Sequence, residues 1–480
     1  MKMKEAKEEY ISKKEGHTYW QWTLALLVTM TVFTYGLDLG WISPMARILQ
    51  SEQSPAGEPL SDVTLSWIAS VLCLAAVFSV YLFSYLADRF GSKASVMAII
   101  VPQAISWILR LCFASGTWLI ISRSFTGIAA AGCFNALVLY IKEISQDSIR
   151  GTLVSMIILM QNIGVFVMYI MGAYLDYYTI VYIVACIPVV TGILLFKAPQ
   201  SPAFLVKQGK TEEAIATLAF LRGLDKDHKI VISEVAMMKN ENDNYKSEPN
   251  MSLISIMKNP IWRRGIIITI FIFAAQSFNG AFALMTYASP ILTSTGVKLS
   301  VSAETLTLSI PPVLIFGSTV NMICAERIGR RTINMLMLSI SACSMLGIAA
   351  SMLIKHFDGT VPSWLPIMSM IVSVWAYAGG VSALPFIVMA EMFSFQIRAK
   401  VMGLIVTLAW FMAFLPIVGY MPLSNAIGLH TTFFIFAGIN MFGVFFTAIF
   451  LPETRGKNVE QIEKALAIRI GLEKVDKNPT

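Results

Sequence analysis

The feature that most constrains this chain is a series of long apolar runs separated by shorter polar segments. Hydrophobic residues make up 56% of the chain and charged residues 14%. Soluble domains average about 45–50% apolar and about 25% charged residues. A run of about 20 apolar residues can cross a bilayer as a helix, because a helix satisfies its own backbone hydrogen bonds. We therefore predict an all-α membrane protein.

Twelve runs are long enough to be transmembrane helices. The predicted spans lie near residues 20–43, 63–86, 94–114, 118–141, 152–175, 178–198, 264–292, 303–325, 332–354, 364–390, 401–422 and 430–451. Among the loops between spans, alternate ones carry most of the Lys and Arg residues, at 88–93, 142–150, 199–263, 326–331 and 391–400. Basic loops stay on the cytoplasmic side of a membrane. With an even number of spans, both termini are expected in the cytoplasm of a multi-pass protein.

The spans group into two six-helix halves joined by a polar insert. The predicted segments are a cytoplasmic N-terminal tail (1–18), a first half (19–198), a cytoplasmic helical insert (199–263), a second half (264–451) and a cytoplasmic C-terminal tail (452–480). In the insert we predict one helix that starts at Thr211 with a hydroxyl cap and stops at Gly223. A second helix is expected over Lys229–Lys239. The alternative for the insert is a disordered linker.

A short charged turn occurs once in each half. Asp88-Arg89-Phe90-Gly91-Ser92-Lys93 follows the second span, and Glu326-Arg327-Ile328-Gly329-Arg330-Arg331 follows the eighth. Glycine permits a tight turn, and the cations keep that turn out of the hydrocarbon. A duplicated turn of this kind indicates two similar halves, which is typical of secondary transporters.

Several blocks along the chain resemble the sugar porter family of the major facilitator superfamily. They are the two charged turns, Glu143 with Arg150-Gly151, Glu391 with Arg398-Ala399, and Pro452-Glu453-Thr454-Arg455-Gly456-Lys457. The chain departs from the family at Ser92, where Arg is usual, and at Pro199-Gln200-Ser201-Pro202-Ala203, which lacks an acid and an Arg. Asn162-Ile163-Gly164 and the short first external loop resemble the insect facilitated trehalose transporter branch.

The charged residues at the predicted inner ends of the helices are candidates for gating salt bridges. They are Asp88, Arg89, Glu143, Arg150, Glu326, Arg330, Glu391 and Arg398. Opposite charges that are partly removed from water attract strongly, so such pairs could lock an inner gate. The alternative is that these residues only anchor helix ends and fix the topology.

Asp38 is an acid deep within the first predicted span. A carboxylate in hydrocarbon costs several kcal/mol unless it is paired or faces water. By the helical rise Asp38 lies roughly 24 Å above Trp22, at the depth of Arg123 in the fourth span, with Arg110 of the third span as a rival partner. In the sugar porter family, proton-coupled members carry an acid at this position, and an arginine matches Arg123. The resemblance thus implies proton coupling by Asp38 and Arg123, and the alternative is a static pair.

Polar and aromatic residues near the predicted midplane are candidates for binding a sugar. Gln161 and Asn162 lie in the fifth span, Gln276 and Asn279 in the seventh, and Trp410 in the eleventh. Amides suit sugar hydroxyls because they both donate and accept hydrogen bonds. The family comparison adds Tyr287, and Phe386 where the family has tryptophan. Each residue could instead bond a neighbouring helix. Gly379-Gly380 and Pro385 are expected to loosen the tenth span.

We expect a transporter that moves a hexose or a disaccharide such as trehalose across the plasma membrane by alternating access. Uniport and proton symport both remain open, and the partners are a small-molecule sugar, the lipid bilayer and, in symport, protons. The alternative is a transporter-like sugar sensor that binds without efficient transport. No nucleophile–base pair or metal-ligand cluster stands out. An enzyme, a metal, a cofactor and a nucleic acid partner are therefore not expected.

The predicted topology places Lys93 and Arg330 on the same side of the membrane. Single cysteines introduced at these two positions in a cysteine-free background should react with a membrane-impermeant thiol reagent from the same face only. Labelling of the two positions from opposite faces would contradict the doubled six-helix arrangement.

Overall fold

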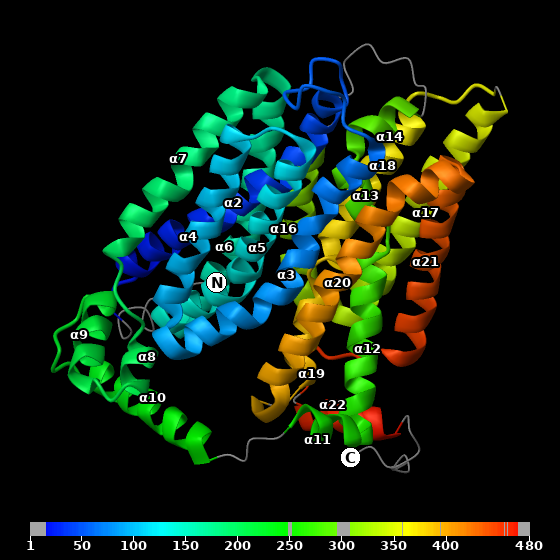
Figure 1. The fold of residues 1–480 in the computed structure, drawn as a ribbon. Coiled ribbons are helices and arrows are strands. Elements are labelled where there is room, and N and C mark those ends of the chain that lie inside the picture. The colour runs from blue at the N-terminus through cyan, green and yellow to red at the C-terminus, as the bar shows by residue number, and fades with distance from the viewer. Residues whose placement is uncertain are drawn as a thin grey trace, which may run out of the picture. The chain divides into compact units, whose positions relative to one another are not determined.

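The computed structural model describes residues 16–247, 252–294, 308–357, 359–393, 395–455, 457 and 459–468. Within that part of the chain the secondary structure is helical and contains no strand (Figure 1). Eleven of the described helices are long and apolar enough to cross a membrane, and a shorter apolar helix covers Ile310–Asn321. The prediction of an all-α membrane protein is confirmed.

The helices of the first half match the first six predicted spans. They are α2 (Tyr19–Leu49), α3 (Asp62–Phe90), α4 (Ser92–Cys112), α5 (Gly116–Ile144), α6 (Asp147–Tyr174) and α7 (Tyr177–Phe196). The insert contains α8 (Pro202–Lys207), α9 (Thr211–Arg222), α10 (Lys229–Ser247) and α11 (Leu253–Lys258). Several helices extend past the predicted ends of their spans, as α2 does when it continues from residue 43 to Leu49.

The second half is more interrupted than the first. Its helices are α12 (Pro260–Ser277), α13 (Ala281–Thr286), α14 (Ala288–Ser294), α16 (Ile310–Ile328), α17 (Arg330–His356), α18 (Trp364–Ala376), η1 (Tyr377–Val381), α19 (Leu384–Met392), α20 (Phe395–Ile427), α21 (Leu429–Phe450) and α22 (Val459–Ile468). The eighth predicted span, 303–325, falls partly outside the described residues.

Contacts divide the chain into two compact units. Unit 1 comprises residues 1–39, 78–165 and 176–249, and unit 2 comprises residues 40–77, 166–175 and 250–480. The helices α2, α3 and α6 therefore each contribute residues to both units. The division of the chain into two six-helix halves separated by the insert remains a prediction.

The two charged turns adopt the predicted tight geometry. Gly91 separates α3 from α4 with φ +90°, and Gly329 separates α16 from α17 with φ +109°. Residues with a side chain rarely adopt such angles. This explains why a glycine stands at the same place in both copies of the turn.

The insert forms a small helical cluster, so the alternative of a disordered linker is not supported for its described residues (Figure 1). Leu218 of α9, Val231 of α10 and Leu205 of α8 are buried together. Helix α9 ends at Gly223 in the left-handed conformation, as predicted. The predicted hydroxyl cap is wrong: Lys210 is the N-cap and caps through no side chain, since Thr211 is already the first helical residue.

The seventh and tenth spans both contain a break. Helix α12 ends at Ser277, and the chain turns at Gly280 with φ +92° before α13. In the tenth span, Tyr377–Val381 form a π-helix that includes Gly379 and Gly380, and Pro385 stands in the first turn of α19. A π-helix widens the local backbone and is frequent at functional sites. The loosening predicted for the tenth span is therefore present.

Helices α2 and α6 cross closely beside Asp38. A side chain on Gly36 would lie 2.2 Å from the backbone oxygen of Gln161, and one on Gly164 would lie 2.3 Å from that of Phe33. Both neighbours are backbone atoms, so they cannot rotate away. The two glycines therefore fix how close α2 lies to α6.

Substitution of Gly164 by alanine should destabilise the protein, because the new methyl group collides with α2. Overpacking of this kind costs about 1–3 kcal/mol or more, so the midpoint of thermal unfolding in detergent should fall by about 5 °C. Gly151 is the matched control in the same helix, since an alanine there meets nothing within 4 Å. Equal midpoints for G164A and G151A would contradict the close crossing.

Candidate functional site

Asp38 lies fully buried in α2 and faces α4 and α5, within unit 1. Its Oδ1 is 2.6 Å from Nη2 of Arg110, which is also fully buried. The Thr126 hydroxyl donates a hydrogen bond of 3.2 Å to the same oxygen. The Asp38 carboxylate is thus held in a direct ion pair whose two side chains are both buried away from solvent.

Arg123 reaches Asp38 mainly through the main chain. Its Nη1 donates a 2.6 Å hydrogen bond to the backbone oxygen of Asp38 and is 4.0 Å from the carboxylate Oδ1. The structure therefore brings both candidate arginines to Asp38 but gives them different contacts. Arg110, the rival partner in the sequence, forms the close contact with the carboxylate.

Hydroxyl groups and an aromatic ring complete the surroundings of Arg110. Its guanidinium donates to Ser106, Ser122 and Thr126 and lies 4.2 Å from the Trp107 ring centroid. The Tyr177 hydroxyl of α7 donates to the backbone oxygen of Arg110 at 3.1 Å. The cluster thus links α2, α4, α5 and α7. It sets two guanidinium groups against one carboxylate, whose Oδ2 has no hydrogen-bond partner among the described residues.

Gln276 stands beside the irregular part of the tenth span, in unit 2. Its Nε2 donates a 3.1 Å hydrogen bond to the backbone oxygen of Ser382, which follows the π-helix directly. The Tyr377 side chain also interacts with Gln276. Phe386 is 41% exposed, and its ring meets that of Phe273 edge to face at 4.9 Å. An amide, a phenol and two phenyl rings therefore gather near one loosened helix.

The other predicted substrate residues of unit 2 have more varied settings. Trp410 is half-buried in α20. Tyr287 is fully buried, stacks on Tyr420 and donates a hydrogen bond to the backbone oxygen of Ile417. Asn279 is also buried, and its Oδ1 accepts from the backbone N–H of Ala281 at 2.8 Å. Asn279 therefore stabilises the break in the seventh span.

Gln161 and Asn162 belong to α6 in unit 1, whereas the five other predicted substrate residues belong to unit 2. Gln161 is half-buried and Asn162 is buried. Sequence reasoning missed Tyr377, Phe273 and Ser382. The sequence offered one clue to each of them. Tyr377 and Ser382 flank the Gly379-Gly380 pair, and Phe273 lies one helical turn before Gln276.

The second half carries a charged network at one end of its helices. Arg330 and Glu391 form an ion pair of 2.9 Å, and the Thr454 hydroxyl donates to Glu391 at 2.6 Å. Glu453 accepts hydrogen bonds from the backbone N–H groups of Arg330 and Arg331 at the start of α17. The side chains of Glu326 and Arg398 lie outside the described residues.

The first half has the same arrangement with fewer charges. Glu143 accepts hydrogen bonds from Ser92 and Ser201, where Glu391 meets Arg330 and Thr454. Gln200 is the counterpart in the first half of Glu453 in the second, and it donates a hydrogen bond to the backbone oxygen of Phe90. The departure at Ser92 therefore replaces the arginine of an ion pair with a neutral hydroxyl donor, and Gln200 stands where the second half has the acid Glu453.

The remaining predicted gating residues have local partners. Asp88 pairs with Lys207 of the insert at 3.3 Å, with both side chains well exposed. Arg89 lies over the ring of Phe90, and Arg150 donates to the backbone oxygen of Ser145. Exposed pairs of this type contribute little to stability. Of the predicted gating residues that the structure describes, Arg330 and Glu391 form the best-buried ion pair.

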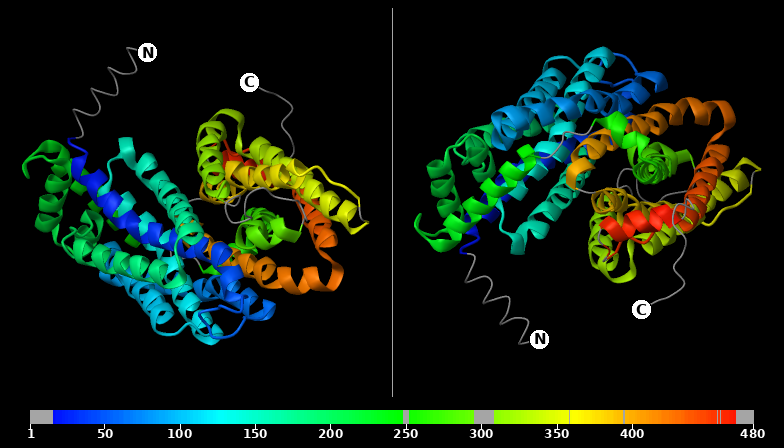
Figure 2. Two further views of the ribbon diagram at one scale, coloured as in Figure 1. Left: turned by 90° about the horizontal axis from the view of Figure 1, so that it is seen from above. Right: turned by 90° about the horizontal axis from the view of Figure 1, so that it is seen from below.

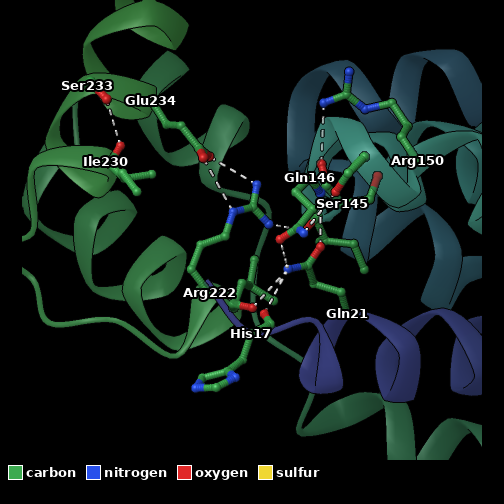
Figure 3. A network of polar contacts seen from close by, with 12 residues as sticks. His17, Gln21, Ser145, Gln146, Arg150, Arg222, Ile230, Ser233 and Glu234 are labelled. Carbon is green, nitrogen blue, oxygen red and sulfur yellow. Dashed lines mark hydrogen bonds and ion pairs between the residues drawn. The ribbon is translucent and has the colours of Figure 1, made fainter. Parts of the chain in front are cut away.

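A polar network that the sequence did not reveal joins the insert to the first half (Figure 3). Arg222 of α9 is buried, pairs with Glu234 at 3.0 Å and donates to the backbone oxygen of Ile144. Gln21 of α2 bonds Gln146 and the backbone oxygen of Leu221. Figure 2 shows the insert (green) at the N-terminal end of α2 (dark blue). The signal available in the sequence was an arginine in the last turn of the predicted helix, directly before Gly223.

Comparisons with known proteins cover nearly the whole chain. The family model described as "Sugar (and other) transporter" matches residues 24–466. The facilitated trehalose transporter Tret1-2 homolog of Drosophila sechellia is 25% identical over 469 residues, which cover 96% of this chain and 94% of that protein. The facilitated trehalose transporter Tret1 of Apis mellifera ligustica is 24% identical, with coverages of 92% and 87%.

Solved structures with the same fold include bacterial transporters. An inward-open structure of the xylose transporter XylE from E. coli has a TM-score of 0.76 and 18% identity, and the match covers 93% of this chain and 99% of that one. A structure of a D-xylose-proton symporter has a TM-score of 0.70 and 17% identity, with coverages of 92% and 100%. At these identities the likeness shows the fold, which is the twelve-helix major facilitator fold.

Replacement of Asp38 by asparagine should destabilise the protein strongly, because it removes the anion from the fully buried 2.6 Å ion pair with Arg110. Removal of one partner from a buried ion pair costs about 3–5 kcal/mol. Thermal unfolding in detergent measures the loss. A second substitution, R110Q, in the D38N background should recover part of it, since both members of the ion pair are then neutral.

Asp176 provides the matched control for an Asp-to-Asn change. It is exposed and caps α7, where hydrogen bonds from the Thr179 hydroxyl and backbone N–H lower the pKa of its carboxyl. Asparagine caps a helix about as well as aspartate. D176N should therefore change the unfolding midpoint little, and a D38N protein as stable as D176N would contradict the buried ion pair.

Proposed function

Since the chain belongs to the sugar transporter family, we propose that it carries trehalose, or a sugar of similar chemistry, across the plasma membrane by alternating access. The observation that carries the proposal is the match of a sugar transporter model along residues 24–466. The relatives from Drosophila sechellia and Apis mellifera ligustica, which are named as facilitated trehalose transporters, match 96% and 92% of the chain. The described apolar helices supply the membrane spans that such transport requires.

Gln276 and its neighbours are the proposed contacts for the sugar in unit 2. The Gln276 amide and the Tyr377 hydroxyl offer hydrogen bonds to sugar hydroxyls. The exposed face of Phe386 and the half-buried Trp410 offer flat apolar surfaces for the sugar ring. A sugar that competes for the Gln276 amide would weaken its bond to Ser382. Binding would then act directly on the segment that follows the π-helix.

The charged networks at the helix ends are proposed as parts of the inner gate. Arg330 and Glu391, with Thr454, would stabilise one end of the second half. Glu143 with Ser92 would do the same, less strongly, in the first half. With basic loops inside, this end and both termini face the cytoplasm. Asp88, Arg89, Arg150, Glu326 and Arg398 would contribute mainly to topology.

The sugar-sensor alternative receives no support from the relatives, whose names describe transporters. The alternative differs from the proposal in one measurable respect. A sensor would show saturable sugar binding with no net movement of sugar into sealed vesicles. Robust uptake of a labelled sugar removes it.

Labelled trehalose and glucose uptake by cells that lack endogenous sugar transport tests the function. The protein should give saturable uptake. The variant Q276A should raise the apparent KM about tenfold, because a lost hydrogen bond costs about 1.4 kcal/mol. The matched control is Q208A, since Gln208 is exposed at the end of α8. Uptake equal to that of empty cells, or equal effects of the two variants, would contradict the proposal or its site.

A further inference from the structure

We infer that Asn440 of α21 is a positioning residue for transport: it fixes the point about which α13 and α14, the part of the seventh span after the break, turn. The inference rests on the proposed alternating access, because a carrier that changes shape needs such a point. It follows from the contacts on the two sides of the break between α12 and α13, all within unit 2. Discontinuous helices of this kind form the substrate sites of many transporters.

One side chain of α21 bonds the backbone at the break. Nδ2 of Asn440 donates a 2.8 Å hydrogen bond to the backbone oxygen of Asn279, the residue before the turn at Gly280. The same nitrogen donates to the backbone oxygen of Phe436, one turn earlier in α21, also at 2.8 Å. Asn440 is fully buried. The break is therefore bonded to the Phe436–Asn440 turn of α21.

Packing at Gly280 brings the break against the same turn of α21. A side chain on Gly280 would lie 2.9 Å from the ring of Phe436 and 2.8 Å from Met345 of α17. The φ of Gly280 is +92°, which also favours glycine at this position. The break thus contacts α21 by close packing as well as by a hydrogen bond.

The side chain of Asn279 extends this contact into α13. Its Oδ1 accepts a 2.8 Å hydrogen bond from the backbone N–H of Ala281, the first residue of α13. Asn440 therefore bonds the backbone of the residue whose side chain bonds the start of α13. A change at Asn440 would pass through Asn279 to α13.

Helix α21 is itself fixed to two neighbours in the second half. Asn334 of α17 donates a 3.0 Å hydrogen bond to the Thr447 hydroxyl of α21. A side chain on Gly443 of α21 would lie 3.2 Å from Leu338 of α17 and 3.3 Å from Ala275 of α12. These close contacts make α21 a firm support for the break.

Beyond the break, the chain contacts a helix of the other predicted half. The Tyr169 hydroxyl of α6 donates a 3.0 Å hydrogen bond to the backbone oxygen of Met285 in α13. Helix α6 belongs to the predicted first half, whereas α21 belongs to the second. The break is thus bonded to one half and α13 to the other. A relative movement of the halves would turn α13 about the break.

Two leucine variants test the inference. N440L removes the donor at the break and keeps the branching of the side chain. N334L is the matched control, because Asn334 is also buried and donates a hydrogen bond between α17 and α21, away from the break. The measurements are exchange of labelled for unlabelled trehalose in sealed proteoliposomes, hydrogen exchange of residues 278–287, and the midpoint of thermal unfolding in detergent.

Both variants should lower the unfolding midpoint by similar amounts, since each loses a buried side-chain donor. N440L alone should speed hydrogen exchange at residues 278–287 about tenfold, because the break loses its bond to α21. Its maximal rate of trehalose exchange should fall about fivefold, while the half-saturating concentration stays within about twofold, since Asn440 is not a proposed sugar contact. N334L should match the native protein in both kinds of exchange.

Equal hydrogen exchange at residues 278–287 in N440L and N334L would overturn the inference, and this measurement does not require sugar transport. Trehalose exchange by N440L equal to that of N334L would overturn it as well. If N440L does not fold, N440A is compared with N334A, with the same expectations. Absence of trehalose exchange in the native protein would instead overturn the proposed function.

Discussion

The placement of one carboxylate among two guanidinium groups in an apolar interior constrains the rest of this structure. A charge in that setting requires a partner at hydrogen-bond distance or contact with water, and here the partner comes from another helix. Asp38 of α2 meets Arg110 of α4, while Arg123 of α5 bonds the backbone beside it. The three helices are therefore held at one depth. The close contact of Gly36 with α6 then fixes a fourth helix against the same place.

The ends of the halves show how a duplicated sequence can diverge while its geometry is kept. The turn glycines, an acid on a later helix and a hydroxyl after the last span recur in both halves. Arg330 in one copy corresponds to Ser92 in the other, so an ion pair is retained in the second half and a hydrogen bond from a neutral hydroxyl replaces it in the first. We expect the contact between Arg330 and Glu391 to be the stronger of the two, since both of its partners can carry charge.

Much of the fold was predictable because long apolar runs and turn glycines report local physics. The spans, the turns at Gly91 and Gly329 and the end of α9 at Gly223 follow from such signals. The partner of Asp38 was not predictable, because the sequence places Arg110 and Arg123 at similar depths in the membrane. Only side-chain packing decides which of the two contacts the carboxylate. The break at Asn279 and the buried Arg222 network also depend on residues far apart in the chain. Depth follows from the helical rise, whereas the choice among neighbours at one depth does not.

The central claim is that the Asp38 carboxylate pairs directly with Arg110 in a dry cluster. An experimental map of the protein in a lipid nanodisc, at a resolution that shows side chains, tests this most directly. The account predicts continuous density between the carboxylate and the Arg110 guanidinium, with Arg123 on the backbone oxygen of residue 38. A carboxylate turned away from Arg110 and bonded only to Arg123, or surrounded by ordered water, would contradict it.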